Sequence, residues 1–149
     1  MNAILQIITA ALGSVGFAGL YHVRGRFYPS IAAGGALCWA VYLAALKQVD
    51  SVFWAGLFSS AATALFSEGA ARWKKTPSSI FFVPCVISLV PGGALYYAIS
   101  SAIQGKRHAA LLYARDTILI AFSIAAGASL VWAYGIMRWK YRLLKKSSH

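Results

Sequence analysis

The sequence predicts an all-α integral membrane protein that crosses the bilayer with five helices. Three observations lead to this prediction: 60% of the 149 residues are hydrophobic, only 11% are charged, and the apolar residues form long runs separated by short polar connectors. A soluble domain carries about 25% charged residues, which cover its surface. The composition therefore excludes a soluble globular enzyme and a disordered tail, and it makes lipid the solvent for most of the chain.

Five apolar runs are long enough to cross the hydrocarbon core of a bilayer, which takes roughly 20 helical residues. We expect them to form a single transmembrane domain that comprises residues 1–149 and ends in a basic cytoplasmic tail. The expected spans are residues 2–20, 28–46, 51–70, 78–103 and 109–137, and the expected tail is residues 138–149.

The lysines and arginines predict which side of the membrane each connector faces, because cytoplasmic loops carry an excess of these residues. With five spans, ten of the 14 lie on the side of the C-terminus and four on the other side, so we expect the C-terminus inside and the N-terminus outside. A re-entrant hairpin in place of the fourth span would split them eight to six, so the charges favour five crossings. The ten are Arg24, Arg26, Arg72, Lys74, Lys75, Arg138, Lys140, Arg142, Lys145 and Lys146, and the four are Lys47, Lys106, Arg107 and Arg115.

Other binding classes find no support in the pattern. The net charge of +11 is spread over short connectors rather than along one exposed face, so we expect no nucleic acid partner. Cys38 and Cys85 lie inside apolar runs and are interpreted as small buried hydrophobic residues. The three histidines are dispersed, so we expect no metal and no cofactor.

Small residues at helical spacing predict close packing between helices, since helices in lipid associate through small side chains that let their backbones approach. Such packing is expected within the chain or against a partner, and it carries no chemistry. The clearest stripes are Gly13, Gly16 and Gly19 in the first run and Gly56, Ser60 and Ala64 in the third.

The fourth run contains the strongest local signal in the sequence. Pro84 and Pro91 lie seven residues apart, and Gly92 and Gly93 follow directly. Each proline removes a backbone donor and clashes with the preceding turn, so the run cannot form one undisturbed helix. The fourth span is therefore expected to be broken at Pro84 and at Pro91-Gly92-Gly93. The expected half-helices are residues 78–88 and 91–103, which meet near the middle of the membrane.

This break is a candidate substrate site. We expect Pro91 at the first position of the second half-helix, where a missing N–H costs nothing. The free N–H groups that follow lie at the positive end of the helix dipole and suit a carboxylate, and secondary transporters place substrate sites at such breaks. A proline kink that serves only packing gives the same pattern, and the sequence leaves both interpretations open. The candidate substrate-binding residues are Ser88, Pro91, Gly92, Gly93, Ala94, Tyr96 and Tyr97.

Two acidic residues are candidates for proton coupling. Asp116 lies seven residues into the last run, beside Arg115, and an ionisable group in a span is a functional candidate, although the run is long enough to place Asp116 at the outer interface. Glu68 lies four residues before Arg72 at the cytoplasmic end of the third run, where an interfacial ion pair is the favoured interpretation. Arg115 is the candidate charge partner for an anionic substrate.

Three segments of the chain match a known pattern: Gly16-Phe17-Ala18-Gly19-Leu20-Tyr21-His22-Val23, Ala71-Arg72-Trp73-Lys74-Lys75-Thr76-Pro77, and residues 83–96 with their Pro-Gly-Gly core. They resemble the C-terminal half of the threonine/serine exporter family, which in many bacteria is a separate small subunit. The resemblance runs from about Leu12 to Lys106, whereas the fifth run is similar only in length and apolar character. The family often has proline at the position of Ser88, so the break is expected to be softer on its N-terminal side.

The resemblance implies a transporter of the bacterial inner membrane that exports small hydrophilic metabolites and is driven by the proton gradient. Members of the family are associated with threonine and serine, and a split two-subunit type with succinate. The resemblance also implies a partner, which is a larger subunit similar to the N-terminal half of the family. A five-span half with its N-terminus outside suits an inverted pairing with a larger half, of about five spans, that begins inside.

One alternative function stays open, and another is not expected. A non-transporting assembly or regulatory subunit, whose broken helix only packs against a partner, has the same sequence features. A membrane-embedded enzyme needs clustered His, Asp or Glu residues or a nucleophile–base pair in the spans, and the sequence has none. The substrate is either a neutral amino acid or a dicarboxylate.

Overall fold

The computed structural model describes the backbone of residues 2–147 and the side chains as far as Met137. This part of the chain is helical and has no β-strand, which confirms the predicted all-α class. The elements are α1 (Ala3–Leu20), the 3₁₀ turn η1 (Gly25–Phe27), α2 (Tyr28–Val49), α3 (Val52–Lys74), α4 (Ser79–Val86), the 3₁₀ turn η2 (Ile87–Leu89), α5 (Gly92–Ile103) and α6 (Arg107–Ser147).

Three stretches of the described chain are long and apolar enough to cross a membrane: α1, the segment Gly25–Val49, and Arg107–Met137 of α6. The pair Ser79–Leu89 and Gly92–Ile103 also qualifies as one span bent by 45°. These stretches correspond to four of the five predicted spans. The predicted third span, α3, has 23 residues but is less apolar than the others, so its crossing remains a prediction.

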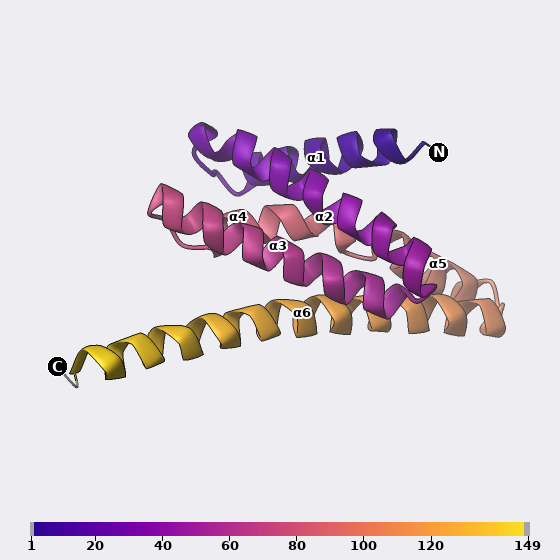
Figure 1. Cartoon of the computed structure of the whole chain (residues 1–149). Helices are drawn as coiled ribbons and strands as arrows, with labels where there is room; N and C mark the ends of the chain where they lie inside the picture. Colours follow the sequence, from indigo (N-terminus) through magenta and orange to yellow (C-terminus); the bar gives the residue numbers. More distant parts are fainter. Residues whose placement is uncertain (1, 148–149) are drawn as a thin grey trace.

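The chain runs back and forth between two ends of an elongated bundle (Figure 1). The N-terminus and the α2–α3 and α5–α6 connectors lie at one end, and the α1–α2 and α3–α4 connectors and the C-terminal part of α6 lie at the other. Helix α3 lies in the middle and packs against α2, α4 and α6. This central position explains its lower hydropathy, because its small polar side chains face neighbouring helices instead of lipid. The fully buried hydroxyl residues of α3 are Ser59, Ser60, Thr63 and Ser67.

The contact between α3 and α6 is very close, because glycines face serines across it. Gly56 of α3 faces the Ser123 side chain, and Gly127 of α6 faces Ser60. The Ser60 hydroxyl donates hydrogen bonds to the carbonyl of Ser123, at 3.1 Å, and to that of Leu57 in its own helix, at 3.1 Å. The predicted packing of the Gly56, Ser60 and Ala64 stripe is therefore confirmed.

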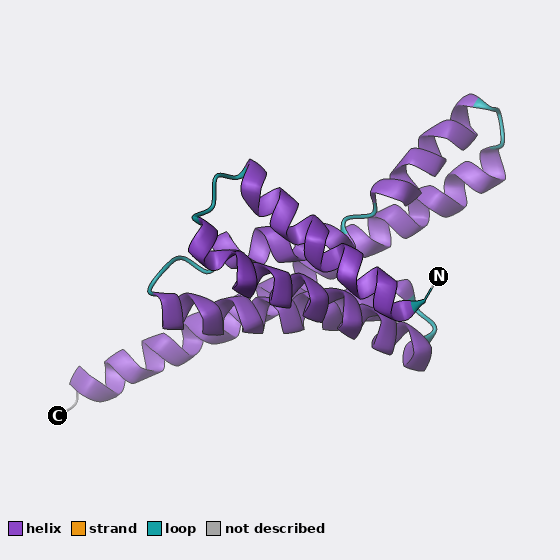
Figure 2. Ribbon diagram, turned by 90° about the horizontal axis from the view of Figure 1, so that it is seen from above, coloured by secondary structure: helices purple, strands orange, loops and turns teal. Residues whose placement is uncertain are grey.

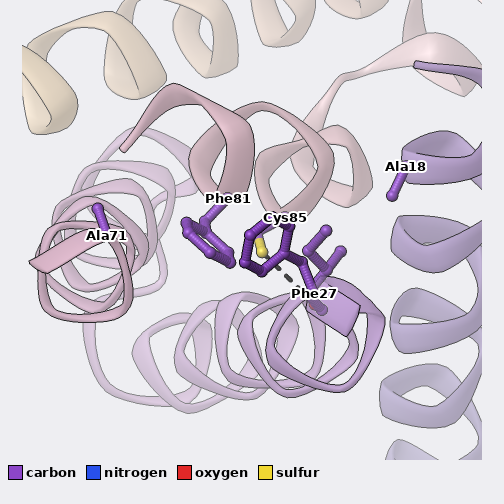
Figure 3. Close-up of a cluster of buried hydrophobic side chains, with 6 residues drawn as sticks. Ala18, Phe27, Ala71, Phe81 and Cys85 are labelled. Carbon is purple, nitrogen blue, oxygen red and sulfur yellow. Dashed lines mark hydrogen bonds between the residues drawn. The ribbon is translucent and has the colours of Figure 1, made fainter. Parts of the chain in front are cut away.

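A second core lies at the end of the bundle where α1, α2, α3 and α4 meet (Figure 3). Phe81 of α4 is fully buried and meets the ring of Phe27 edge-on, with 5.4 Å between ring centroids. The Cys85 thiol donates to the carbonyl of Ile31 at 3.5 Å. Cys85 and Cys38 are both buried and free, which confirms their interpretation as small core residues.

The last two helices form a hairpin that projects from the bundle (Figure 2). Helix α5 packs extensively against α6 alone among the described elements. Helix α6 has 41 residues, which at about 1.5 Å per residue is roughly twice the thickness of the hydrocarbon core. Its first part pairs with α5 and its later part packs against α3, so the predicted last span and basic tail belong to one helix.

We predict that Gly127→Ala loosens the α3–α6 contact. The added methyl group would lie 2.6 Å from the carbonyl oxygen of Leu57 and 3.0 Å from the amide nitrogen of Ala61, and these backbone atoms cannot move aside alone. Overpacking of this kind costs about 1–3 kcal/mol. The thermal unfolding midpoint of the purified chain in detergent should fall. Gly69→Ala in α3 is the matched control, because nothing lies within 4 Å of the added group; an equal loss in both variants would contradict the packing account.

Candidate functional site

The helix break lies after η2, at Val90 and Pro91. Val90 is extended, with φ −60° and ψ 123°. Pro91 is the N-cap residue of α5, and Gly92 is the first residue of that helix. Pro91 therefore precedes the second half-helix instead of occupying its first position, and the predicted half-helices 78–88 and 91–103 are corrected to 79–89 and 92–103. The extended Val90 ends the helical path before the proline, because a residue that precedes proline avoids the α region.

Pro84 does not break the span, contrary to the prediction. It lies inside α4 and is fully buried. As the sixth residue of this short helix, it removes a single hydrogen bond, the one to the carbonyl of Ile80, and the helix continues to Val86. The break of the fourth run is thus confined to Val90, Pro91 and the two glycines.

The start of α5 exposes its backbone. Gly92 N–H donates to the carbonyl of Val90 at 2.8 Å, so this group is bonded, whereas the sequence predicted it to be free. Leu95 N–H donates to the carbonyl of Pro91 at 2.9 Å. The N–H groups of Gly93 and Ala94 have no acceptor among the described residues. A Cβ added at Gly92 or Gly93 would find no atom within 4 Å. The backbone here is accessible to a ligand or to another protein.

A cavity of about 510 Å³ lies beside the break, between α1, α2 and η2. Ser88 lines it from η2, and its hydroxyl donates to the carbonyl of Cys85 at 3.3 Å. The opposite walls bring polar groups: the Trp39 indole donates to the Gln6 amide oxygen at 3.1 Å, and the Thr9 hydroxyl donates to the carbonyl of Gln6 at 2.9 Å. The site therefore combines apolar walls with a few polar groups, as small-molecule sites do.

Sequence reasoning missed Gln6, Thr9 and Trp39. A signal was available for the first two, because Gln6, Thr9 and Gly13 have the spacing that places residues on one helix face. Two hydrogen-bonding side chains on one face of an apolar run indicate that this face meets polar groups or water instead of lipid. Trp39 comes from a different run, and only the fold brings it to Gln6.

The other predicted substrate-binding residues do not line this cavity. Tyr96 and Tyr97 are 66% and 54% exposed on α5. Tyr97 packs on Tyr113 of α6, with 5.5 Å between ring centroids, and Tyr96 lines a smaller cavity of about 270 Å³ near Gln104. The structure thus brings Ser88 to the cavity and Gly93 and Ala94 to the open helix start, while the two tyrosines lie farther along the hairpin.

The charged candidates lie in three different surroundings. Glu68 forms an ion pair with Arg72, with 3.0 Å between carboxylate oxygen and guanidinium nitrogen, as the favoured interpretation predicted. Asp116 is half-buried on α6 and lies close enough to Tyr42 of α2 to interact with it electrostatically, whereas Arg115 is exposed. Among the described residues, no three His, Cys, Asp or Glu side chains gather as a metal site requires.

The comparison with known families bears directly on this helical bundle with a broken helix. The family model of the threonine/serine exporter ThrE matches residues 6–133. The chain belongs to the threonine/serine exporter family. The match extends beyond the segments that carried the resemblance and includes most of α6. At the family level this exporter is a membrane transporter and not an enzyme. No solved structure matches it.

We predict that the cavity beside Ser88 of this exporter contains water. Ser88→Cys should then react with a small maleimide in intact membranes. The native Cys38 and Cys85 should stay unmodified, since both are 0% exposed. Leu130→Cys is the control, because Leu130 is 62% exposed on an apolar surface of α6, where thiolate formation is suppressed by lipid. Mass spectrometry of the labelled chain gives the result, and equal labelling at positions 88 and 130 would rule out an aqueous cavity.

Proposed function

We propose that this chain is the small subunit of a heteromeric secondary-active exporter that acts with a larger subunit of the same family. The substrates are small hydrophilic metabolites that carry a carboxylate, such as threonine, serine or succinate. The site of action is the bacterial inner membrane, and the proton gradient drives export. The observation that carries the proposal is the open start of α5 at Gly92 and Gly93, on a helix that packs to any extent only against α6 among the described elements.

The open helix start needs a cover. A polar group without a partner in hydrocarbon costs several kcal/mol, so irregular backbone at membrane depth must be buried in protein or line a cavity. The N–H groups of Gly93 and Ala94 have no acceptor in the described chain, and α5 packs only against α6 to any extent. A larger subunit that lies against the α5–α6 hairpin supplies the missing protein surface, and a substrate carboxylate supplies the missing acceptor.

The proposed topology has five crossings, with the N-terminus outside and the C-terminus in the cytoplasm. The alternation of connectors between two ends supports it, since Arg24, Arg26 and the basic α3–α4 connector lie at the same end as the last part of α6 (Figure 1). Helix α3 then crosses with its serine-bearing face packed against the neighbouring helices α2, α4 and α6. Its serines are compatible with this position because the neighbouring helices, and not lipid, surround them.

Substrate binding is assigned to the two sides of the break. On one side, Ser88 faces the cavity that Gln6, Thr9 and Trp39 also line. On the other side, Pro91 and Gly92 directly precede Gly93 and Ala94. The N–H groups of Gly93 and Ala94 are free of acceptors in the described chain, and the helix dipole favours a carboxylate there. Tyr96 and Tyr97 are exposed on the following turn, and we assign them to the surface that the larger subunit covers.

Asp116 is the proposed proton-coupling residue. It is half-buried within the stretch of α6 that is apolar enough to cross the membrane. Ionisable groups in such surroundings are typical of proton relays. Glu68 is the weaker candidate for this role because Arg72 already neutralises it. Arg115 stays the proposed charge partner of an anionic substrate.

The alternative is an assembly or regulatory subunit that transports nothing. The open positions Gly13 and Gly16 of α1 favour it as much as they favour the exporter, because no atom of the described residues lies within 4 Å of an added Cβ at either position. An open stripe of small residues fits a packed partner helix. In this alternative, the break at Pro91 serves packing only.

Efflux from preloaded cells tests the proposal. Cells that lack both subunits receive this chain alone, the larger subunit alone, or both, and the release of threonine, serine and succinate is followed in parallel. We expect efflux only with both chains. Efflux with the larger subunit alone would make this chain an accessory, and efflux with this chain alone would refute the need for a partner.

Gly93→Leu tests the role of the break within the same assay. No described atom lies within 4 Å of a Cβ at this position, so the subunit should fold and should co-purify with its partner. The blocked backbone should lower efflux at least about tenfold, the effect of losing one or two hydrogen bonds to a charged group. Gly25→Leu is the matched control, because Gly25 is equally open but lies in η1, away from the break. Unchanged efflux in Gly93→Leu would remove the break from the substrate path.

A further inference from the structure

A second cavity, of about 720 Å³, lies at the opposite end of the bundle from the N-terminus. It is found where α3 ends, α4 begins and α6 continues toward the C-terminus (Figure 1). It shares no lining residue with the cavity beside Ser88. Trp132 and Ile136 of α6 form an apolar wall of the cavity. The remaining lining includes negatively and positively charged side chains.

Glu68 supplies the negative charge of this cavity. Its side chain is 21% exposed, and its Oε2 accepts from an Arg72 guanidinium N–H at 3.0 Å. Its Oε1 lies beside Gly135 of α6, where an added Cβ would be 3.0 Å away. Any larger residue at position 135 would press on the carboxylate, so the glycine leaves room for Glu68 at the cavity wall.

The α3–α4 connector supplies positive charge and a free hydroxyl. Lys75 adopts the left-handed conformation, with φ 52°, and Thr76 N–H donates back to the carbonyl of Ala71 at 3.0 Å, which folds the connector over the end of α3. Lys75 and Thr76 both line the cavity as a result. The Thr76 hydroxyl oxygen is buried and has no hydrogen-bond partner among the described residues.

We propose that this cavity binds a small zwitterion, a molecule with one ammonium and one carboxylate group. Glu68 Oε1 accepts from the ammonium, Arg72 and Lys75 bind the carboxylate, and the unpartnered Thr76 hydroxyl bonds a polar group of the side chain. The role of the cavity as the cytoplasmic entrance for exported amino acids rests on the proposed function, whereas binding itself does not.

The arrangement of charges selects this ligand class. Among the residues whose side chains are described, the lining holds one anionic group, Glu68, and two cationic groups, Arg72 and Lys75. A dicarboxylate places its second negative charge against Glu68, and a diamine places its second positive charge against Arg72 and Lys75. A zwitterion alone satisfies both signs, since opposite charges attract and like charges repel over the few ångströms of such a site.

Ligand binding to the full chain in lipid nanodiscs tests this site. L-threonine, succinate and 1,4-diaminobutane are titrated separately, and the thermal unfolding midpoint and the tryptophan fluorescence are recorded. We expect L-threonine to raise the midpoint and to change the fluorescence, and the fluorescence change should disappear in Trp132→Phe. Succinate and the diamine should bind at least about tenfold more weakly, since each leaves one charged group without its ion pair. No response to L-threonine, or equal binding of all three, would overturn the proposal.

Glu68→Gln locates the binding. This variant keeps the shape of the side chain and removes its charge, so L-threonine should bind about tenfold more weakly and the preference over succinate should be lost. Asp50→Asn is the matched control, because Asp50 lies in the α2–α3 connector, at the end of the bundle away from this cavity. L-threonine should bind to Asp50→Asn with unchanged affinity. Unchanged binding in Glu68→Gln would place the ligand elsewhere.

Lys75→Asn keeps the site testable if Glu68→Gln does not fold. Asparagine tolerates the left-handed backbone of position 75, and its neutral side chain removes one carboxylate partner. We expect weaker L-threonine binding here also, and full affinity would contradict the assignment. Because these titrations involve no transport, binding without efflux would refute the exporter proposal alone, and efflux without binding at this cavity would refute the site alone.

Discussion

Polar groups inside a bilayer have no water to bind, and this constraint explains where the polar residues of the chain lie. Helix α3 is the least apolar of the predicted spans, and its hydroxyl-bearing face packs against the neighbouring helices α2, α4 and α6. Most of its buried hydroxyl groups bind carbonyls instead of water: Thr63 donates to Ser59 in its own helix at 2.8 Å, and Ser60 donates across to Ser123. The more apolar spans, which are α1, α2 and the stretch Arg107–Met137 of α6, then present their outer faces to lipid. A bundle with α3 at its edge would leave these serines facing hydrocarbon.

The same constraint makes the helix break informative. The described chain gives acceptors to the hydroxyl groups of Ser59, Ser60 and Thr63 of α3, but Ser67 finds none. The N–H groups of Gly93 and Ala94 at the start of α5 also stay open, and the α5–α6 hairpin extends away from the bundle (Figure 2). A subunit that functioned alone would be expected to cover this backbone with its own helices. In the proposed function, the open break is the place where the backbone meets substrate or partner, and the broken helices of secondary transporters bind substrates in this way.

Local patterns predicted local structure well. The residues Pro91, Gly92 and Gly93 locate the break to within a residue, and the four-residue spacing of Glu68 and Arg72 gives their ion pair. Pro84 shows the limit of such reasoning, because this buried proline removes a single hydrogen bond of a short helix and leaves the helix intact. The stripe at Gly13 and Gly16 shows another limit, since small residues indicate a close approach without naming the helix that approaches. Both cavities depend on residues that only the fold brings together, Trp39 with Gln6 and Gly135 with Glu68, so no sequence pattern could predict them.

The central claim is that a larger subunit covers the start of α5, and photo-cross-linking tests it most directly. A benzophenone amino acid is placed at Tyr96, which is 66% exposed on α5, or at Leu65, which is 58% exposed on α3. Cells that express both subunits are then irradiated. The account predicts a heterodimer adduct from position 96 and none from position 65. Co-purification of the two subunits with no adduct from position 96 would contradict it, because the partner would then bind elsewhere and leave the break uncovered.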